Sequence, residues 1–145
     1  MMKKIMPLLT LIILSISSIC YAFDPPDSNR WFWVGSDSKY GFWIDRQTLT
    51  FNTDHNKYSN CYKHRIVTAW ILSYTAKDDT HMLSKNVYDI DCRKSKTLSF
   101  VEYNSNNEMI HSYTFNYPTY EPIIPNTWGE GILESLNILW FIYNK

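Results

Sequence analysis

Two cysteines, four histidines and two neighbouring aspartates are the residues whose types and spacing could support chemistry. Asp89 and Asp91 lie two positions apart, so on a strand they would share one face and could act as an acid–base pair. The histidines show no helical pairing, and none has a serine or cysteine nearby in a recognised nucleophile setting. The four histidines are His55, His64, His81 and His111. We therefore predict a protein that is not an enzyme.

The cysteines Cys61 and Cys92 favour a disulfide. The segment Cys61–His64 together with Asp91 and Cys92 could be drawn as a metal site, but a closed zinc site normally shows paired ligand spacings on both sides. An exported, oxidising setting favours a disulfide over a thiolate ligand. We expect no metal and no cofactor; two buried thiols and a metal site are the alternatives to the disulfide.

Export is predicted by the first residues of the chain. Two lysines precede an apolar run over residues 5–19, and Cys20 and Ala22 provide small residues at the −3 and −1 positions of a cleavage site. This order is typical of a secretory signal peptide over residues 1–22, with a mature chain that starts at Phe23.

Two alternatives to simple cleavage concern a membrane anchor. A spanning helix needs about 20 apolar residues, and this run is shorter and contains Pro7. Acylation of Cys20 would also anchor the chain, but a bacterial lipoprotein signal has a small residue directly before the cysteine, where this chain has Ile19. We expect cleavage after Ala22, with lipidation at Cys20 as the alternative.

The remaining residues, 23–145, have the length of a single domain. The formal net charge is +0, which gives no support for nucleic-acid binding. Aromatic residues make up 17% of the chain, which has only 4 glycines, and this composition suits packed β-structure. We expect no transmembrane span in the mature chain.

Alternating and β-branched stretches predict about six antiparallel strands in hairpins. They are residues 31–34 with 40–44, 66–74 with 87–90, and 97–103 with 108–117. The stretch Asn52 to Asn60 is predicted as loop, and the three prolines of Pro118–Pro125 predict that the sheet ends there.

A C-terminal helix is predicted after these prolines. Thr127 and Glu130 have the form of a capping box. The apolar stripe that follows is Ile132, Leu133, Leu136, Leu139, Trp140 and Tyr143. The predicted fold class is therefore α+β, a small antiparallel β-sheet with one C-terminal amphipathic helix packed on it.

The central hairpin would bring the two cysteines together if its turn is centred near residues 76 and 77. In that register Cys61 lies directly opposite Cys92, with Cα atoms about 4.5 to 5.5 Å apart, a separation that a disulfide tolerates. A one-residue bulge would spoil this register.

An aromatic cluster occupies the first predicted hairpin. Its members are Trp31, Phe32, Trp33, Tyr40, Phe42 and Trp43. Strand alternation should bury about half of the cluster, and the other half would form an exposed apolar patch of the kind that marks a protein contact.

Several short motifs, taken in order, resemble the surface-adhesin protein E family of Gram-negative bacteria over Trp31 to about Leu139. They are Trp33-Val34-Gly35, Phe42-Trp43-Ile44-Asp45 before Thr48-Leu49, Val67-Thr68-Ala69-Trp70, Tyr88-Asp89-Ile90-Asp91-Cys92, and Tyr120-Glu121-Pro122-Ile123-Ile124-Pro125-Asn126-Thr127. The resemblance implies an antiparallel sheet with a C-terminal helix. It also implies an outer-membrane adhesin that binds host epithelium and extracellular-matrix or plasma proteins such as laminin and vitronectin, and that forms dimers.

One family feature differs in this chain. Family members usually carry a cysteine near the end of the helix that pairs with the cysteine matching Cys92, and residues 136–140 contain none. The resemblance thus implies Cys61 as the substitute partner. We expect an exported, non-enzymatic, adhesin-like protein that binds another protein at the outer-membrane surface; the alternative is a periplasmic binding domain that contacts a component of the cell envelope.

Overall fold

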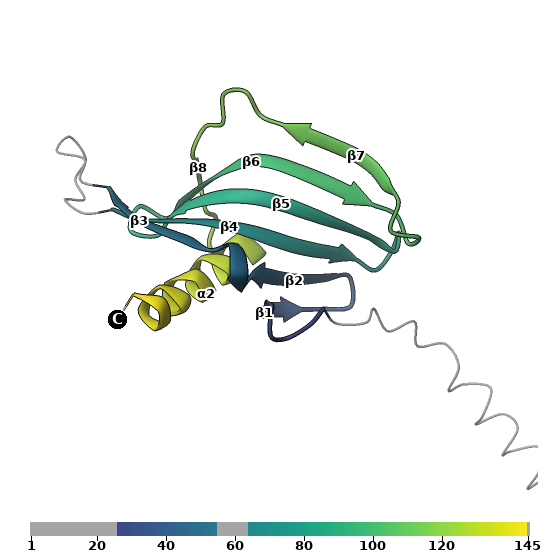
Figure 1. Ribbon diagram of the computed structural model, residues 1–145, viewed down its shortest axis with the longest axis horizontal. Helices are drawn as coiled ribbons and strands as arrows, with labels where there is room; N and C mark the ends of the chain where they lie inside the picture. The colour runs from purple at the N-terminus through teal and green to yellow at the C-terminus, as the bar shows by residue number, and fades with distance from the viewer. Residues whose placement is uncertain (1–25, 55–63, 145) are drawn as a thin grey trace, which may run out of the picture.

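Residues 26–54 and 64–144 are described by the computed structural model, in which a curled antiparallel sheet carries an α-helix on one side (Figure 1). The elements are β1 (Trp31–Ser36), β2 (Tyr40–Asp45), the 3-10 helix η2 (Arg46–Thr48), β3 (Thr50–Asp54), β4 (His64–Thr75), β5 (Thr80–Asp89), β6 (Lys94–Tyr103), β7 (Met109–Thr114), β8 (Glu121–Pro122) and α2 (Trp128–Tyr143). The predicted signal peptide, residues 1–22, and Cys61 lie outside the described residues.

The sheet has eight strands, and six of them follow the order β1-β2-β4-β5-β6-β7. The predicted α+β fold class is confirmed, but the prediction of about six strands missed two short ones. β3 pairs with β4 and includes Asn52, which was expected to begin a loop. β8 pairs with β6, although the sheet was expected to end before it. Pro122 can join because at a sheet edge its missing N–H removes no ladder bond.

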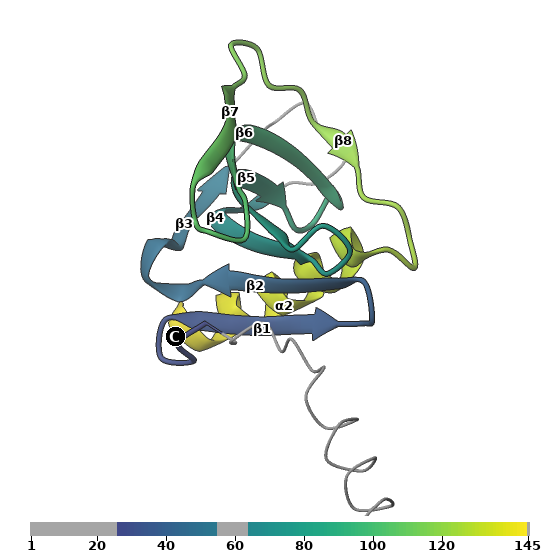
Figure 2. The same cartoon turned by 90° about the vertical axis from the view of Figure 1, so that its right-hand side faces the viewer.

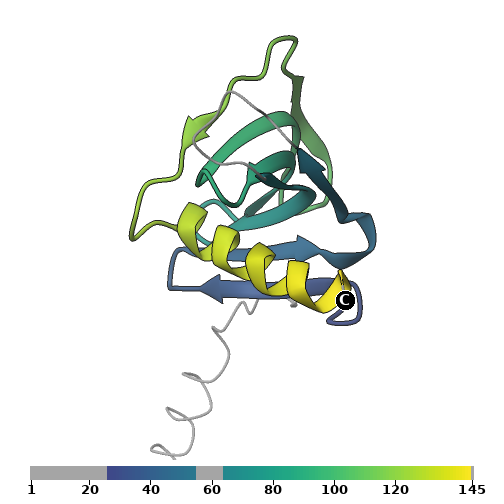
Figure 3. The ribbon, with the colours of Figure 1, turned by 90° about the vertical axis from the view of Figure 1, so that its left-hand side faces the viewer.

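The helix covers one face of the first hairpin. β1 and β2 lie in front of α2 in Figure 2 and behind it in Figure 3, where the view is from the opposite side. We call the face that packs against α2 the covered face and the opposite one the open face. Because successive strand residues point to opposite faces, each strand contributes side chains to both. Within the described residues, no helix has the length and apolar character that a membrane span requires.

The hydrophobic core lies between the covered face and α2. Strands, the turn after β5 and α2 all contribute to it: Ile44, Val67, Ala69, Ile71, Tyr88, Ile90, Ile132, Leu133, Leu136 and Leu139. Burying one such aliphatic side chain stabilises the fold by about 1.5 to 3 kcal/mol. Most of the predicted helical stripe is therefore confirmed, but Tyr143 is 51% exposed, where it stacks on Phe51.

The start of α2 departs from the predicted capping box. Thr127 is the N-cap residue, yet its hydroxyl donates to the carbonyl of Ile124 instead of accepting from the helix. The Glu130 carboxylate accepts from the backbone N–H of Asn126 at 2.8 Å and pairs with Arg93. Both halves of the expected reciprocal pattern are thus replaced by contacts to the preceding turn and to the end of the sheet.

A polar clamp also ties the sheet to the helix. The Arg65 guanidinium on β4 lies 2.6 Å from an Asp91 oxygen, and its Nη1 donates to Asn137 Oδ1 on α2 at 2.7 Å. Burial opposes ionisation of Asp91, but the hydrogen bonds and charge of Arg65 outweigh it, so the pKa of Asp91 lies below its ordinary value.

Candidate functional site

The aromatic residues of the first hairpin divide between the two faces. Phe32 and Phe42 pack against the core on the covered face, and the Phe42 ring lies 4.9 Å from that of Trp128 on α2. Trp33 lies opposite Trp43 in the β1–β2 ladder, and both line a groove on the open face. The expected alternation holds for Phe32, Trp33, Phe42 and Trp43, but Tyr40, two residues before Phe42 on β2, also lines the groove.

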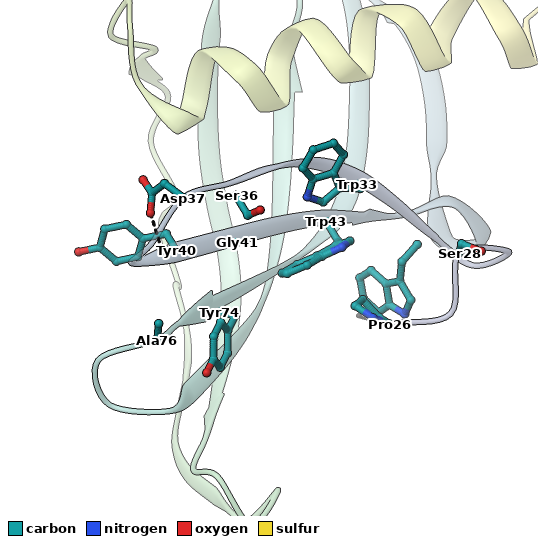
Figure 4. Close-up of a pocket in the computed structure, with 11 residues that line it drawn as sticks. Pro26, Ser28, Trp33, Ser36, Asp37, Tyr40, Gly41, Trp43, Tyr74 and Ala76 are labelled. Atoms are coloured by element: carbon teal, nitrogen blue, oxygen red, sulfur yellow. Dashed lines mark hydrogen bonds between the residues drawn. The ribbon is translucent and has the colours of Figure 1, made fainter. Parts of the chain in front are cut away.

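The groove encloses about 520 Å³ and is predominantly aromatic (Figure 4). Its aromatic lining consists of Trp31, Trp33, Tyr40, Trp43 and Tyr74. Figure 4 shows Pro26, from the segment before β1, at one end of the groove and Ala76 at the other. The lining therefore comes from three places in the sequence: the segment before the sheet, the first hairpin and the end of β4.

Gly41 lets the indole of Trp43 form the floor of the groove. A Cβ atom on Gly41 would come within 2.4 Å of Trp43 Cη2, closer than real Cβ atoms approach a neighbour. Trp43 is consequently only 7% exposed, whereas Trp33 beside it is 59% exposed and Tyr40 is 42% exposed. The groove thus has a fixed floor and accessible walls.

Asp37 supplies the charge of the groove. Among the described residues it is the only charged one in the lining, and it lies in the turn between β1 and β2. Its carboxylate accepts hydrogen bonds from the backbone N–H groups of Lys39 at 2.7 Å and Tyr40 at 2.8 Å. These bonds hold the pKa of Asp37 below its ordinary value, so the carboxylate is an anion at neutral pH.

Tyr74 forms the boundary with a second hollow on the same face. Burial, and then a 3.0 Å hydrogen bond from its hydroxyl to Asp79, raise the pKa of Tyr74. The second hollow encloses about 590 Å³, shares Trp31 and Tyr74 with the groove, and continues over Leu83 toward Tyr103. The open face is therefore hollowed from the first hairpin to the middle of the sheet.

A separate cluster joins three of the residues that could support chemistry. His64 Nδ1 lies 2.7 Å from Asp89 Oδ2 and 3.3 Å from Cys92 Sγ, and the Cys92 backbone N–H donates to the other Asp89 oxygen. Their ligand atoms lie within 4.8 Å of one another, so these three residues could hold a metal ion. The sequence had offered Asp91 for such a site, whereas the structure places Asp89 there.

The cluster does not have the geometry of a nucleophile relay. A relay needs the nucleophile on one imidazole nitrogen and the carboxylate on the other, but Asp89 and Cys92 both contact Nδ1 of His64. Metal binding would need Cys92 as a thiolate ligand, and a Cys92 that forms a disulfide has no thiolate to offer. A metal site is therefore the alternative to the predicted disulfide.

The register behind the predicted disulfide is wrong. The ladder pairs Ile66 with Asp89 and Thr75 with Thr80, which differs by two residues from the register that placed Cys61 opposite Cys92. The turn spans residues 76–79 and closes with Asp79 at φ 49°, a left-handed conformation that aspartate tolerates. The disulfide stays a prediction, because Cys61 lies outside the described residues.

Asp89 and Asp91, which the sequence allowed as an acid–base pair, do not contact each other but have separate partners. Asp89 contacts His64, and Asp91 contacts Arg65. His64 and Arg65 are consecutive residues of β4, so their side chains point to opposite faces of the sheet. β5 ends at Asp89, so Asp91 lies in the following turn and no longer follows strand alternation. Of the other histidines, His81 lines the second hollow and His111 lies on β7, while His55 is outside the described residues.

Seven residues of the groove lie outside the aromatic cluster that the sequence predicted: Pro26, Ser28, Ser36, Asp37, Gly41, Tyr74 and Ala76. Tyr74 lies opposite Gly41 in the β2–β4 ladder, and this pairing could be anticipated only from the strand order. Asp37 shows the local pattern of an Asx turn, because its side chain accepts hydrogen bonds from the backbone N–H groups two and three residues later.

Comparison of the chain with protein-family models, with curated proteins and with solved structures finds no match. The resemblance to the surface-adhesin protein E family therefore stays a prediction from the quoted motifs.

Proposed function

We propose that this chain is an exported, non-enzymatic binding domain that holds an extended segment of another protein in the groove. The observation that carries this proposal is the gathering of Trp31, Trp33 and Trp43 on the open face, in one hollow. Tryptophan and tyrosine are enriched among the residues that dominate protein–protein binding energy, especially where they line a desolvated pocket. Such residues are also costly to expose without a partner.

The composition of the groove favours binding over catalysis. Among the described residues, no histidine or cysteine lines it, and its carboxylate, Asp37, accepts from two backbone N–H groups through Oδ1. A catalytic pocket would need a base within hydrogen-bond reach of a nucleophile. The His64 cluster lies elsewhere, in a smaller hollow with Tyr120 and Lys94.

Export leaves two locations for the partner, the outer-membrane surface and the periplasm. The resemblance to adhesins favours the outer-membrane surface, with host matrix or plasma proteins as partners. The cleavage site after Ala22 favours the alternative, a periplasmic domain that contacts an envelope component. Protease treatment of intact cells separates them: loss of the protein from intact cells supports the surface, and loss only after the outer membrane is opened supports the periplasm.

The binding proposal is tested by selecting peptides from a random display library on the folded domain. We expect recovered peptides to bind the wild-type domain and to lose at least about tenfold in affinity to Trp33→Ala. Tyr117→Ala is the matched control, because Tyr117 is 92% exposed and does not line the groove. The proposal fails if no recovered peptide distinguishes Trp33→Ala from the control.

A further inference from the structure

We infer that the groove selects a proline-rich segment in the polyproline II conformation, with a basic residue at the end that lies beside Asp37. This inference rests on the proposed function, since it specifies the partner of the same groove. It combines the aromatic lining, the placement of Pro26 and the distribution of charge along the groove.

The aromatic lining suits a polyproline II segment. Such segments dock in aromatic-lined grooves, and because they are already extended in solution they lose little conformational entropy on binding. The chain itself places a proline ring, that of Pro26, in the lining with Trp31 and Trp33. The exposed Trp33 indole and Tyr40 hydroxyl can donate hydrogen bonds to the carbonyls of a segment that has few N–H groups of its own.

Charge distinguishes the two ends of the groove. At one end the Arg30 guanidinium lies 5.2 Å from the centre of the Trp31 ring and 2.7 Å from the buried Asp45 carboxylate. Because Asp45 is buried and already paired with Arg30, it is not available to a further cation. The other carboxylate of this segment, Asp27, accepts a hydrogen bond from the backbone N–H of Asn29 and does not line the groove. At the other end lies Asp37, the one charged residue that the described part of the chain contributes to the lining.

The surroundings of Asp37 also favour a basic residue. The two hairpin turns at that end carry Asp37, Asp78 and Asp79 against Lys39 and Lys77, a net negative charge. Tryptophan rings of the open face already lie beside cations: Lys85 Nζ is 6.0 Å from the centre of the Trp70 ring, and the Arg30 guanidinium is 5.2 Å from that of Trp31. An arginine or lysine of the partner that reaches Asp37 would gain both a charge contact and a cation–π contact.

The composition of the selected peptides tests this inference. We expect the peptides that require Trp33 to be enriched in proline and to carry an arginine or lysine at one end. Recovery of Trp33-dependent peptides without proline or without a basic residue would overturn the inference and leave the proposed function standing. If no peptide requires Trp33, both fail.

Substitutions in a synthetic copy of the most enriched peptide then locate the charge. Changing the basic residue of the peptide to glutamine should weaken its binding to the wild-type domain about fivefold to tenfold. The same peptide change should have little effect on binding to the Asp37→Asn domain, which has already lost the charge contact. Asp78→Asn is the control, because it makes the same change in net charge in a neighbouring turn and does not line the groove. An equal loss in Asp78→Asn and Asp37→Asn would contradict the placement of the basic residue beside Asp37.

Discussion

On each face of the β1–β2 hairpin a tryptophan ring packs against a glycine, but only one of the two faces is covered by the helix. On the covered face, a Cβ atom on Gly35 would come within 2.8 Å of the Trp128 ring, and on the open face a Cβ on Gly41 would come within 2.4 Å of Trp43. Each glycine thus lets an indole lie against a strand. On the covered face the indole belongs to Trp128 of α2, and the helix covers the strands there. On the open face no helix covers Trp43 in the described structure, and its indole forms the floor of an accessible groove.

This difference separates stability from binding within one hairpin. Side chains that point to α2 are buried and close-packed, so changes there should mainly alter the free energy of unfolding. Side chains in the walls of the groove, such as Trp33 and Tyr40, retain exposed surface, so changes there should mainly alter affinity. The following substitutions test that separation, beginning with the largest expected effect on stability.

Leu136→Ala should be the most destabilising change. Leu136 of α2 is 0% exposed in the core against the covered face, and its truncation leaves a cavity that costs about 2 to 5 kcal/mol. Ile138→Ala on the same helix is the control, because Ile138 is 54% exposed and should change stability by about 0.5 kcal/mol or less. Chemical denaturation measures both; equal losses would mean that α2 does not pack as described.

The two glycines compare the faces directly. Gly35→Ala and Gly41→Ala should each destabilise by about 1 to 3 kcal/mol, because the added methyl group displaces an indole. Under conditions where both variants remain folded, Gly41→Ala should also weaken peptide binding, since it moves the floor of the groove. Binding that weakens equally in Gly35→Ala would show that the faces are not independent.

Acid should reveal the clamp on the covered face. Because the folded pKa of Asp91 is below its unfolded value, its contribution to stability is present above about pH 4 and is lost as the pH falls through the folded pKa. Asp91→Asn should therefore cost about 1 to 2 kcal/mol at neutral pH and flatten the loss of stability in acid. Denaturation curves from pH 7 to pH 3 would contradict this if the wild-type and variant slopes coincide.

Trp33→Ala should have the smallest effect on stability. Trp33 is 59% exposed, so the free energy of unfolding should change by about 0.5 kcal/mol while peptide binding is lost. Thermal and chemical unfolding beside Tyr117→Ala provide the measurement. A loss of stability comparable with that of Leu136→Ala would place Trp33 in the core and remove the distinction between the faces.

Local periodicity explains what the sequence could predict. The alternation of residues 31–34 and 40–44 separated Phe32 and Phe42 from the groove tryptophans, since a period of two depends only on neighbours in the chain. The apolar stripe of α2 was likewise predictable, because its spacing follows from the helical repeat. These two patterns were sufficient for the fold class and for the first hairpin.

Pairing between distant segments explains what the sequence missed. The register of β4 and β5 depends on the conformation of the turn at 76–79, and an error of two residues there displaced Cys92 relative to Cys61. Tyr74 enters the groove only because β2 pairs with β4 across the intervening η2 and β3. The grouping of His64 with Asp89 and Cys92 likewise depends on that register and on the turn after β5.

The indole N–H signals of the tryptophans can show directly which face of the hairpin binds a peptide. Trp31, Trp33 and Trp43 line the groove, whereas Trp128 and Trp140 contact Phe42 and Phe51 on the covered face. Titration of the ¹⁵N-labelled domain with a selected peptide, followed through the indole N–H signals, should shift those of the three groove tryptophans and leave those of Trp128 and Trp140 in place. Shifts confined to Trp128 and Trp140 would contradict the assignment of the groove as the binding surface.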